Sequence, residues 1–399
     1  MINVSKLYCG ITQPADHLRY GQGMGAPKSA SERKPIVVWN ITRRCNLRCI
    51  HCYSDSEARE YPGELTAEQC HSVVEDLAQY GVPGVLLSGG EPLVHPRFFE
   101  IATHAREKGM RVTLSTNGTM IDRDVAKRLK ELNLAYVGIS LDGIGETHDY
   151  FRGRAGTFDK AVAAFRNCKA VGQKVGLRLT LSRSTIGDLE GILNFIEQEG
   201  IDRVCFYHLV YSGRGSHLVE VPHESTRRAV GMIMDRAAKW AAEGSNREVL
   251  TVDQPADGAH IYLRLLKEDP EKAEKMRELL EWNGGGTNSS GTGIGNIDTQ
   301  GNVHPDQFWQ SLTLGNVKER PFSEIWQGRD NPLLQALRNR REHLKGRCGG
   351  CRFLNMCGGG FRVRAVQVHN DIWAPDPACY LTDEEIGYTP KPEAAGVAA

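Results

Sequence analysis

The chain has 399 residues, of which 40% are hydrophobic, enough to bury one large core with a smaller appended module. Its 49 basic and 49 acidic residues balance, so net charge predicts neither a nucleic-acid groove nor a membrane surface. No stretch reaches the roughly 18 to 20 apolar residues of a membrane span, and no signal peptide is evident. With 11 cysteines in such a chain, we expect a cytoplasmic protein in a reducing compartment.

Residues 35–222 alternate between apolar runs and amphipathic helical stretches. The runs have the length and β-branched or aromatic content of buried parallel strands. They cover residues 36–41, 84–89, 112–116, 136–142, 175–181 and 204–211. Four of the intervening helices are predicted to end at Gly81, Gly109, Gly172 and Gly200. Six βα units in series predict an α/β fold with a parallel sheet, either open or closed into a partial barrel.

Beyond residue 222 the pattern changes to two long helical stretches, at 225–244 and 259–282. The glycine-rich segment 283–296 lacks the Lys-Ser/Thr ending and the preceding strand of a phosphate loop. We expect it to form a flexible loop or lid near the substrate. Residues 301–317 predict a short hairpin, which a cysteine-rich segment follows.

The cysteines fall into two clusters, at 45–52 and 348–379, and four scattered positions that we interpret as ordinary apolar residues. The first cluster, TRRCNLRCIHCYSD, places Cys45, Cys49 and Cys52 in a C-x3-C-x2-C pattern directly after the first strand. A structural zinc site would require a fourth nearby ligand. Three thiols suggest a metal centre with one open position.

This pattern resembles that of the radical S-adenosylmethionine (SAM) superfamily, whose fold is a partial (β/α)6 barrel with its chemistry at the carboxyl ends of the strands. The resemblance implies that the three thiolates bind three irons of a [4Fe–4S] cluster and leave the fourth iron open to SAM. It also implies a set of SAM contacts at the ends of the later strands. These are Gly89, Gly90 and Glu91 in GGEP, Asn117 in STNG, Ser140 and Asp142 in SLD, and Arg178.

His51 stands where the family usually has an aromatic residue. We expect it to pack beside the cluster rather than to bind iron, although an imidazole there can also tune the cluster through a hydrogen bond.

The second cluster, Cys348, Cys351, Cys357 and Cys379, resembles the SPASM/Twitch extension of radical SAM proteins. Its spacing alone leaves zinc and iron–sulfur open, whereas the resemblance implies an auxiliary [4Fe–4S] cluster. The full seven-cysteine pattern has two further cysteines, where this chain has Asp306 and Phe361. We therefore expect no second auxiliary cluster, and whether Asp306 contacts metal stays open.

Longer segments such as VVWNITRRCNLRCIHCYS, YVGISLDGIGETHDYFRG and DPACYLTDEEIG resemble the radical SAM enzymes of modified-tetrapyrrole biosynthesis. The resemblance implies removal of the two acetate side chains of 12,18-didecarboxysirohaem to give iron-coproporphyrin III. The related alternative is removal of propionates from the same substrate in haem d1 biosynthesis, and the opening MINVSKLYCG favours the deacetylase.

The expected partners are the iron tetrapyrrole and a low-potential electron donor of the flavodoxin or ferredoxin type, with no nucleic acid and no membrane. A polyanionic iron macrocycle needs cations and an axial ligand near the barrel mouth. Four residues are candidates for binding the macrocycle, and a purely structural role is the alternative for each. They are His208, Arg214, His260 and His304.

The predicted divisions follow these motifs. They are an N-terminal extension at 1–34, the radical SAM barrel at 35–222, a helical segment with the glycine-rich loop at 223–296, the auxiliary cluster domain at 297–385 and a flexible tail at 386–399.

Two other classes of protein fit part of the pattern. A peptide-modifying maturase with the same extension would usually carry a leader-recognition domain, for which the residues before the first strand are too few. An electron-transfer iron–sulfur protein would explain both cysteine clusters, but not the GGEP motif or the six-strand scaffold.

Overall fold

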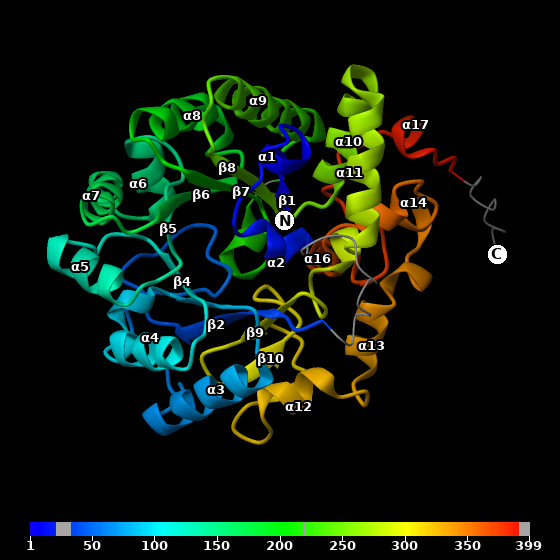
Figure 1. Ribbon diagram of the computed structural model, residues 1–399. Helices are drawn as coiled ribbons and strands as arrows, with labels where there is room; N and C mark the ends of the chain where they lie inside the picture. Colours follow the sequence, from blue (N-terminus) through cyan, green and yellow to red (C-terminus); the bar gives the residue numbers. More distant parts are fainter. Residues whose placement is uncertain (21–32, 219, 391–399) are drawn as a thin grey trace.

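The structure, a computed structural model, describes residues 1–20, 33–218 and 220–390. Six parallel strands in consecutive order form the centre of its sheet (Figure 1). They are β2 (Ile36–Thr42), β3 (Val85–Gly89), β4 (Val112–Thr116), β5 (Tyr136–Ser140), β6 (Val175–Leu181) and β7 (Arg203–His208). All six predicted strands, and the α/β partial-barrel fold, are confirmed.

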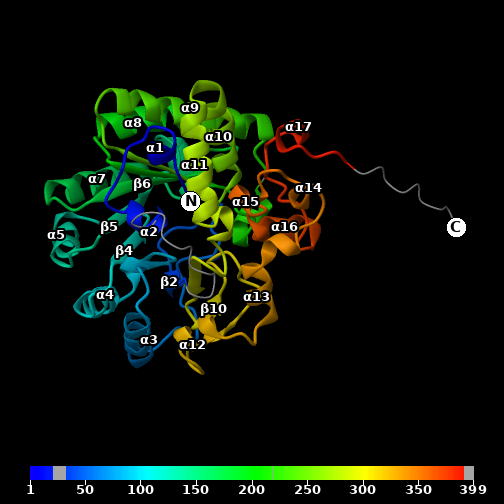
Figure 2. The same ribbon diagram turned by 45° about the vertical axis from the view of Figure 1, so that its right-hand side comes forward.

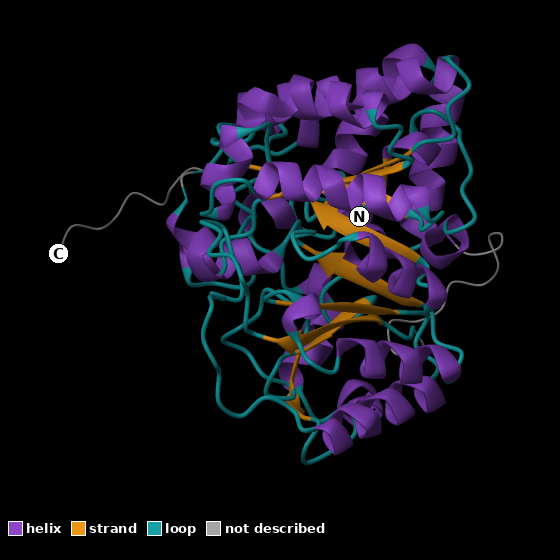
Figure 3. Cartoon of the chain, turned by 90° about the vertical axis from the view of Figure 1, so that its left-hand side faces the viewer, coloured by secondary structure: helices purple, strands orange, loops and turns teal. Residues whose placement is uncertain are grey.

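Helices cover the outer face of these strands (Figure 3). They are α3 (Ala67–Tyr80), α4 (Phe98–Glu107), α5 (Arg123–Glu131), α6 (Glu146–Arg152), α7 (Thr157–Ala170) and α8 (Leu189–Gln198). The four glycines predicted to end helices all have a left-handed backbone, with φ between 55° and 77°. Left-handed φ is least costly for glycine, so these positions stop the helices. Each strand therefore returns in parallel, and all six carboxyl ends meet at one edge.

Further strands extend the sheet at both edges. At one edge β8 (Glu248–Val252) pairs in parallel with β7, and β1 (Ile2–Asn3) pairs antiparallel with β8. Strand β8 is missing from the sequence prediction because its charged first residue disguises a buried strand. Glu248 is 2% exposed and forms ion pairs with Arg203 and Arg19.

At the opposite edge β9 (Ile294–Ile297) runs parallel to β2. The predicted hairpin is confirmed as β10 (Asn302–His304) and β11 (Gly315–Asn316), with β10 also pairing antiparallel with β9. The glycine-rich segment leads directly into β9. A Cβ on Gly286 would lie 1.8 Å from the carbonyl oxygen of Cys357, so this segment is packed against the C-terminal region. The expectation of a flexible lid is therefore wrong.

The helical segment after the barrel contains three helices rather than two, namely α9 (His223–Ala242), α10 (Ala256–Glu268) and α11 (Pro270–Trp282). The second predicted stretch is broken at Asp269, whose carboxylate caps the backbone N–H of Lys272. Pro270 occupies the first position of α11, where its missing N–H costs nothing.

Short helices follow in the C-terminal segment (Figures 1 and 2). They are α12 (Phe322–Gln327), α13 (Pro332–Arg338), α14 (Gly346–Gly349), α15 (Leu354–Cys357), α16 (Arg362–His369) and α17 (Asp383–Ile386). Two more, α1 (Val4–Leu7) and α2 (Asp16–Tyr20), follow β1. Helix α12 packs beside α3, and α15 packs beside α10 and α11. Residues 391–399 of the predicted tail lie outside the described residues. None of the described helices is long and apolar enough to cross a membrane.

Candidate active site

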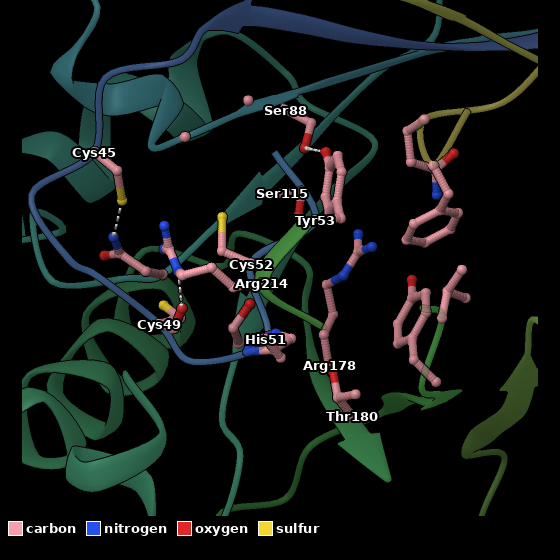
Figure 4. A pocket seen from close by; sticks show the side chains of 18 of the residues that line it. Cys45, Cys49, His51, Cys52, Tyr53, Ser88, Ser115, Arg178, Thr180 and Arg214 are labelled. Carbon is pink, nitrogen blue, oxygen red and sulfur yellow. Dashed lines mark hydrogen bonds between the residues drawn. The ribbon is translucent and has the colours of Figure 1, made fainter. Parts of the chain in front are cut away.

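The three N-terminal cysteines lie on the loop that leaves β2 at the carboxyl edge of the sheet, and all three line one cavity (Figure 4). Each sulfur faces an N–H donor. Leu47 N lies 3.4 Å from the Cys45 sulfur, Arg152 donates to Cys49 at 3.6 Å, and Ser56 N lies 3.4 Å from the Cys52 sulfur. Such donors stabilise thiolates and cluster sulfur.

Burial raises the pKa of Cys45 to about 12 and also raises the pKa of Cys49. Without a metal these thiols would therefore be neutral, and a bound cation is what favours the thiolate form. Among the described residues no three His, Cys, Asp or Glu side chains are gathered closely enough to hold a single metal ion. In a [4Fe–4S] cluster each thiolate binds a different iron, so the donor set fits such a cluster.

Gly89 and Gly90 line the same cavity and bring the end of β3 against the cysteine loop. Gly90 N donates to the Thr42 carbonyl at 2.7 Å. A Cβ on Gly90 would lie 2.3 Å from the carbonyl oxygen of Arg44, and one on Gly89 would lie equally close to Thr42 O. Both glycines therefore allow a close backbone approach between the end of β3 and the loop that carries the cysteines. Their predicted contact with SAM stays a prediction.

The Glu91 carboxylate is fully buried and is not among the residues that line the cavity. It accepts hydrogen bonds from Thr116 Oγ1 and Asn117 N, both at 2.7 Å, and from Leu93 N at 3.1 Å. Glu91 thus fixes the end of β4 from behind. Its predicted contact with SAM stays a prediction.

Asn117 lines the cavity and ties β4 to the cysteine loop, because its Nδ2 donates to Asn46 Oδ1 at 2.9 Å. Ser140 and Arg178 also line the cavity, and they are register partners on β5 and β6. The Arg178 guanidinium lies over the Tyr207 ring, 4.7 Å from its centroid. Figure 4 shows this side chain across the cavity from the cysteines.

Asp142 is buried behind the wall rather than in the cavity. Its carboxylate pairs with Arg152 and accepts the backbone N–H of Thr180 at 2.6 Å. Arg152, which the sequence analysis missed, lines the cavity and bonds the Cys49 sulfur. Asp142 therefore positions a cation beside the Cys49 sulfur. Only the position of this arginine next to the SLD motif could have revealed it.

His51 packs as expected. Its ring stacks on Phe151, with centroids 4.3 Å apart and an interplanar angle of 25°. Burial lowers the pKa of His51 well below its ordinary value, with Arg152 and Arg214 adding to the shift, so the ring is neutral. Its buried Nδ1 has no hydrogen-bond partner among the described residues.

Of the four candidate groups for the macrocycle, two line the cavity. His208 does so with its Nε2 2.9 Å from Asp257 Oδ2. Arg214 donates to the carbonyls of Cys49 and Ser56 at 2.8 and 2.9 Å, so it holds the cysteine loop. His260 and His304 do not line the cavity.

The space between protein atoms in and around this cavity is about 1090 Å³, a figure that includes its open mouth. Its wall divides into a thiol side and an aromatic side. Aromatic rings of Tyr53 and Phe308 meet edge to face at 5.2 Å, and Tyr207 lies beneath Arg178. The sequence analysis missed these rings and Asp253, which also line the cavity.

The four C-terminal cysteines line a second, smaller cavity of about 400 Å³. Burial raises the pKa of Cys357 well above its ordinary value, and the other three thiols add to the shift. A metal centre bound in this cavity would favour the thiolate form of all four cysteines, whose pKa values are raised without it. They fit the auxiliary cluster that the resemblance implies.

Asp306 lies outside that second cavity. Its buried carboxylate accepts hydrogen bonds from Ser290 Oγ and from Phe308 N. Phe361, at the other departing position, packs edge to face on Phe308 at 5.6 Å. Asp306 and Phe361, the two positions where this chain lacks a cysteine of the seven-cysteine pattern, are therefore both packed against other protein groups.

Comparisons with known proteins agree with this geometry. The Radical SAM superfamily model matches residues 39–196, and the model of SPASM, an iron-sulfur cluster-binding domain, matches residues 291–352. The chain is 50% identical to the Fe-coproporphyrin III synthase of Methanosarcina barkeri, over 97% of this chain and 99% of that protein. The chain belongs to the radical SAM superfamily. It is also 46% identical to the pre-heme d1 synthase of Dinoroseobacter shibae, over 89% of this chain and 88% of that protein.

Solved radical SAM structures share the fold. The superposition with anSMEcpe bound to AdoMet and a peptide has a TM-score of 0.67 at 21% identity, over 87% of this chain and 94% of that one. Streptococcus suis SuiB bound to S-adenosylmethionine gives 0.66 at 18% identity, over 88% and 78%. The protein is a radical SAM enzyme, and its cofactors are SAM and [4Fe–4S] clusters.

Proposed function

We propose that this enzyme removes the two acetate side chains of 12,18-didecarboxysirohaem and so produces iron-coproporphyrin III. The observation that carries the proposal is the 50% identity to Fe-coproporphyrin III synthase over 99% of that protein. The cavity supports it, because a thiol side for the cofactor faces an aromatic side whose flat rings suit a macrocycle. We place the reaction in the cytoplasm.

On the thiol side, Cys45, Cys49 and Cys52 would hold the [4Fe–4S] cluster, and Cys348, Cys351, Cys357 and Cys379 the auxiliary one. A reduced [4Fe–4S] cluster held by the first three cysteines would supply the electron for reductive cleavage of SAM, and the radical so formed would abstract hydrogen from the substrate. The chain's own residues position SAM and exclude water. We assign this positioning to Gly89, Gly90, Asn117, Ser140 and Arg178 directly, and to Glu91 and Asp142 through the residues that they hold.

On the aromatic side, Tyr53, Tyr207 and Phe308 offer flat apolar surfaces on which a macrocycle can stack. His208 is the candidate ligand for the substrate's iron. Its contact with the buried Asp257 leaves the other ring nitrogen available, which is the usual arrangement of a metal-binding histidine. A low-potential donor of the flavodoxin or ferredoxin type would supply the electron.

The second candidate is propionate removal in haem d1 biosynthesis, which the 46% identity to pre-heme d1 synthase favours. Both reactions begin with the same substrate, so one experiment separates them. The reconstituted protein is incubated anaerobically with dithionite, SAM and 12,18-didecarboxysirohaem, and both 5′-deoxyadenosine and the tetrapyrrole mass are followed. Loss of two acetate units supports the proposal, and loss of propionate units moves the enzyme to the second reaction. Deoxyadenosine with an unchanged tetrapyrrole overturns both and directs the search to peptide substrates.

A further inference from the structure

Asp253 stands in the wall of the active-site cavity without a role in the reaction described above. It follows β8, a strand outside the six that form the barrel, and is 8% exposed. Its Oδ2 is buried and has no hydrogen-bond partner among the described residues. A buried polar atom that lacks a partner is costly unless a ligand supplies one.

The backbone of Asp253 is held in a conformation that few residues adopt. Its φ is 65°, in the left-handed region, where aspartate and asparagine are tolerated better than other side chains. Arg364 donates to its carbonyl oxygen at 2.7 Å. The structure thus fixes the direction of this carboxyl group from outside the cavity.

The cations in the same wall show what kind of ligand would satisfy it. Arg152 is paired with Asp142, and Arg214 is paired with Asp55 at 2.5 Å. Among the described residues that line the cavity, Arg178 is therefore the arginine without a carboxylate partner, and it is the one assigned above to SAM. The acidic side chains of the tetrapyrrole are thus left to another polar group of this wall. The charges of Arg178 and Asp253 are close enough to influence each other.

We propose that Asp253 recognises one carboxylate side chain of the iron tetrapyrrole by donating a hydrogen bond to it from its protonated form. This inference rests on the proposed function, since it names the part of the site that reads the substrate's acidic side chains. A neutral acid and an amide both donate to a carboxylate, whereas an ionised Asp253 would repel it.

The surroundings favour the neutral form. Burial raises the pKa of Asp253. Four positive groups lower it, and the loss of hydration outweighs them: the Met1 amino group just before β1, Arg364 on α16, His208 on β7 and Arg178 on β6. A carboxylic acid kept neutral in an apolar site can serve as a hydrogen-bond donor at neutral pH.

The test measures binding rather than turnover. Iron-coproporphyrin III is titrated into the cluster-loaded enzyme, and its absorbance is followed over a range of pH. For the wild type we expect constant affinity at low pH and a loss of affinity as the pH rises through the raised pKa of Asp253. Asp253→Asn keeps a donor and tolerates the same φ, so its affinity is expected to match the low-pH value and to lack this step.

Asp253→Gly removes the donor without straining the left-handed backbone. We expect it to bind about tenfold more weakly than the wild type at low pH, the effect of one lost hydrogen bond of about 1.4 kcal/mol. Its iron content verifies that the variant is folded. The control is Asp298→Asn, an acid outside the cavity that pairs with His304, for which the pH step must persist.

The outcomes are distinct. If the wild type binds no iron tetrapyrrole, the proposed function fails. If it binds and Asp253→Asn keeps the pH step, or if Asp253→Gly binds as tightly as the wild type, the role of Asp253 is overturned while the proposed function stands.

Discussion

Arg364 and Asp376 form a fully buried ion pair between the two cavities, with two hydrogen bonds of 2.9 and 2.8 Å. Asp376 lines the cavity of the C-terminal cysteines. Arg364 also donates to the carbonyls of Leu209 and Asp253, both of which line the active-site cavity. One ion pair therefore joins the walls of both proposed cluster sites.

Removing one partner of the Arg364–Asp376 ion pair should destabilise the folded protein. We expect Asp376→Asn to lower the free energy of unfolding by about 3 to 5 kcal/mol, because it leaves the Arg364 charge buried and uncompensated. Anaerobic denaturant unfolding measures the loss. The control is Asp371→Asn, which breaks the exposed pair with Lys345 and should cost less than about 1 kcal/mol. Equal losses in the two variants would contradict this role.

Separate variants should distinguish the two clusters. We expect Cys348→Ala to retain the iron and the SAM cleavage of the first site, and Cys45→Ala to abolish SAM cleavage while the auxiliary iron remains. The reason is that each set of thiols lines its own cavity. Iron analysis should give about eight atoms in the wild type and about four in each variant if both sites hold [4Fe–4S] clusters. A Cys348→Ala protein that binds no iron would contradict this independence.

The sequence predicted the six barrel strands because each is a short apolar run, and four of them follow a glycine that ends the preceding helix; both are local signals. It missed β8 because Glu248 hides a buried strand. The pairing that buries Glu248, with Arg19 and Arg203, joins residues far apart in the chain. The glycine-rich segment was misinterpreted for a similar reason, since its partner is the backbone of Met356 and Cys357.

The candidate active site shows the same contrast between residues that a local motif reveals and residues that only the folded structure reveals. Cysteine spacing and the GGEP motif could be recognised because their chemistry needs fixed local geometry. The supporting residues could not, because Arg152 and Asp253 acquire meaning only through the side chains and the cavity beside them. A lone arginine or aspartate in a sequence carries no such information.

Gly90 offers a test of the close approach between β3 and the cysteine loop. We expect Gly90→Ala to destabilise the protein by about 1 to 3 kcal/mol and to reduce retention of the first cluster, because the new Cβ would meet Arg44 O at 2.3 Å. Thermal unfolding and iron content measure both effects. Gly231→Ala, within α9 and with open space around its Cβ, should instead leave stability unchanged or raise it by up to about 1 kcal/mol. Full iron content in Gly90→Ala would show that the loop can move away.

The proposed iron ligand can be examined spectroscopically. We expect His208→Ala to shift the absorbance bands of bound iron-coproporphyrin III, because one axial nitrogen is lost, while SAM cleavage without substrate persists. Asp257→Asn should produce a smaller shift, since Asp257 orients the ring from 2.9 Å. His304→Ala serves as the control, because its ring lies outside the cavity. An unchanged spectrum in His208→Ala would assign the ligand elsewhere.

Asp306 should make stability depend on pH. Burial raises its pKa to about 6, whereas an unfolded aspartate titrates near 4. The folded state therefore holds its proton more tightly, so the stabilisation is complete below about pH 4 and is lost as the pH rises through 6. Between pH 5 and 8 we expect this group to lower the free energy of unfolding by about 1 to 1.5 kcal/mol.

Asp306→Asn keeps the size of the side chain and removes its titration. Urea unfolding of the wild type and this variant at pH 5 and pH 8 isolates the contribution, since all other groups are common to both proteins. The difference between the two should grow in favour of the variant at pH 8, because the ionised carboxylate is then buried only in the wild type. Parallel pH profiles would mean that the hydrogen bonds from Ser290 and Phe308 keep Asp306 ionised throughout this range.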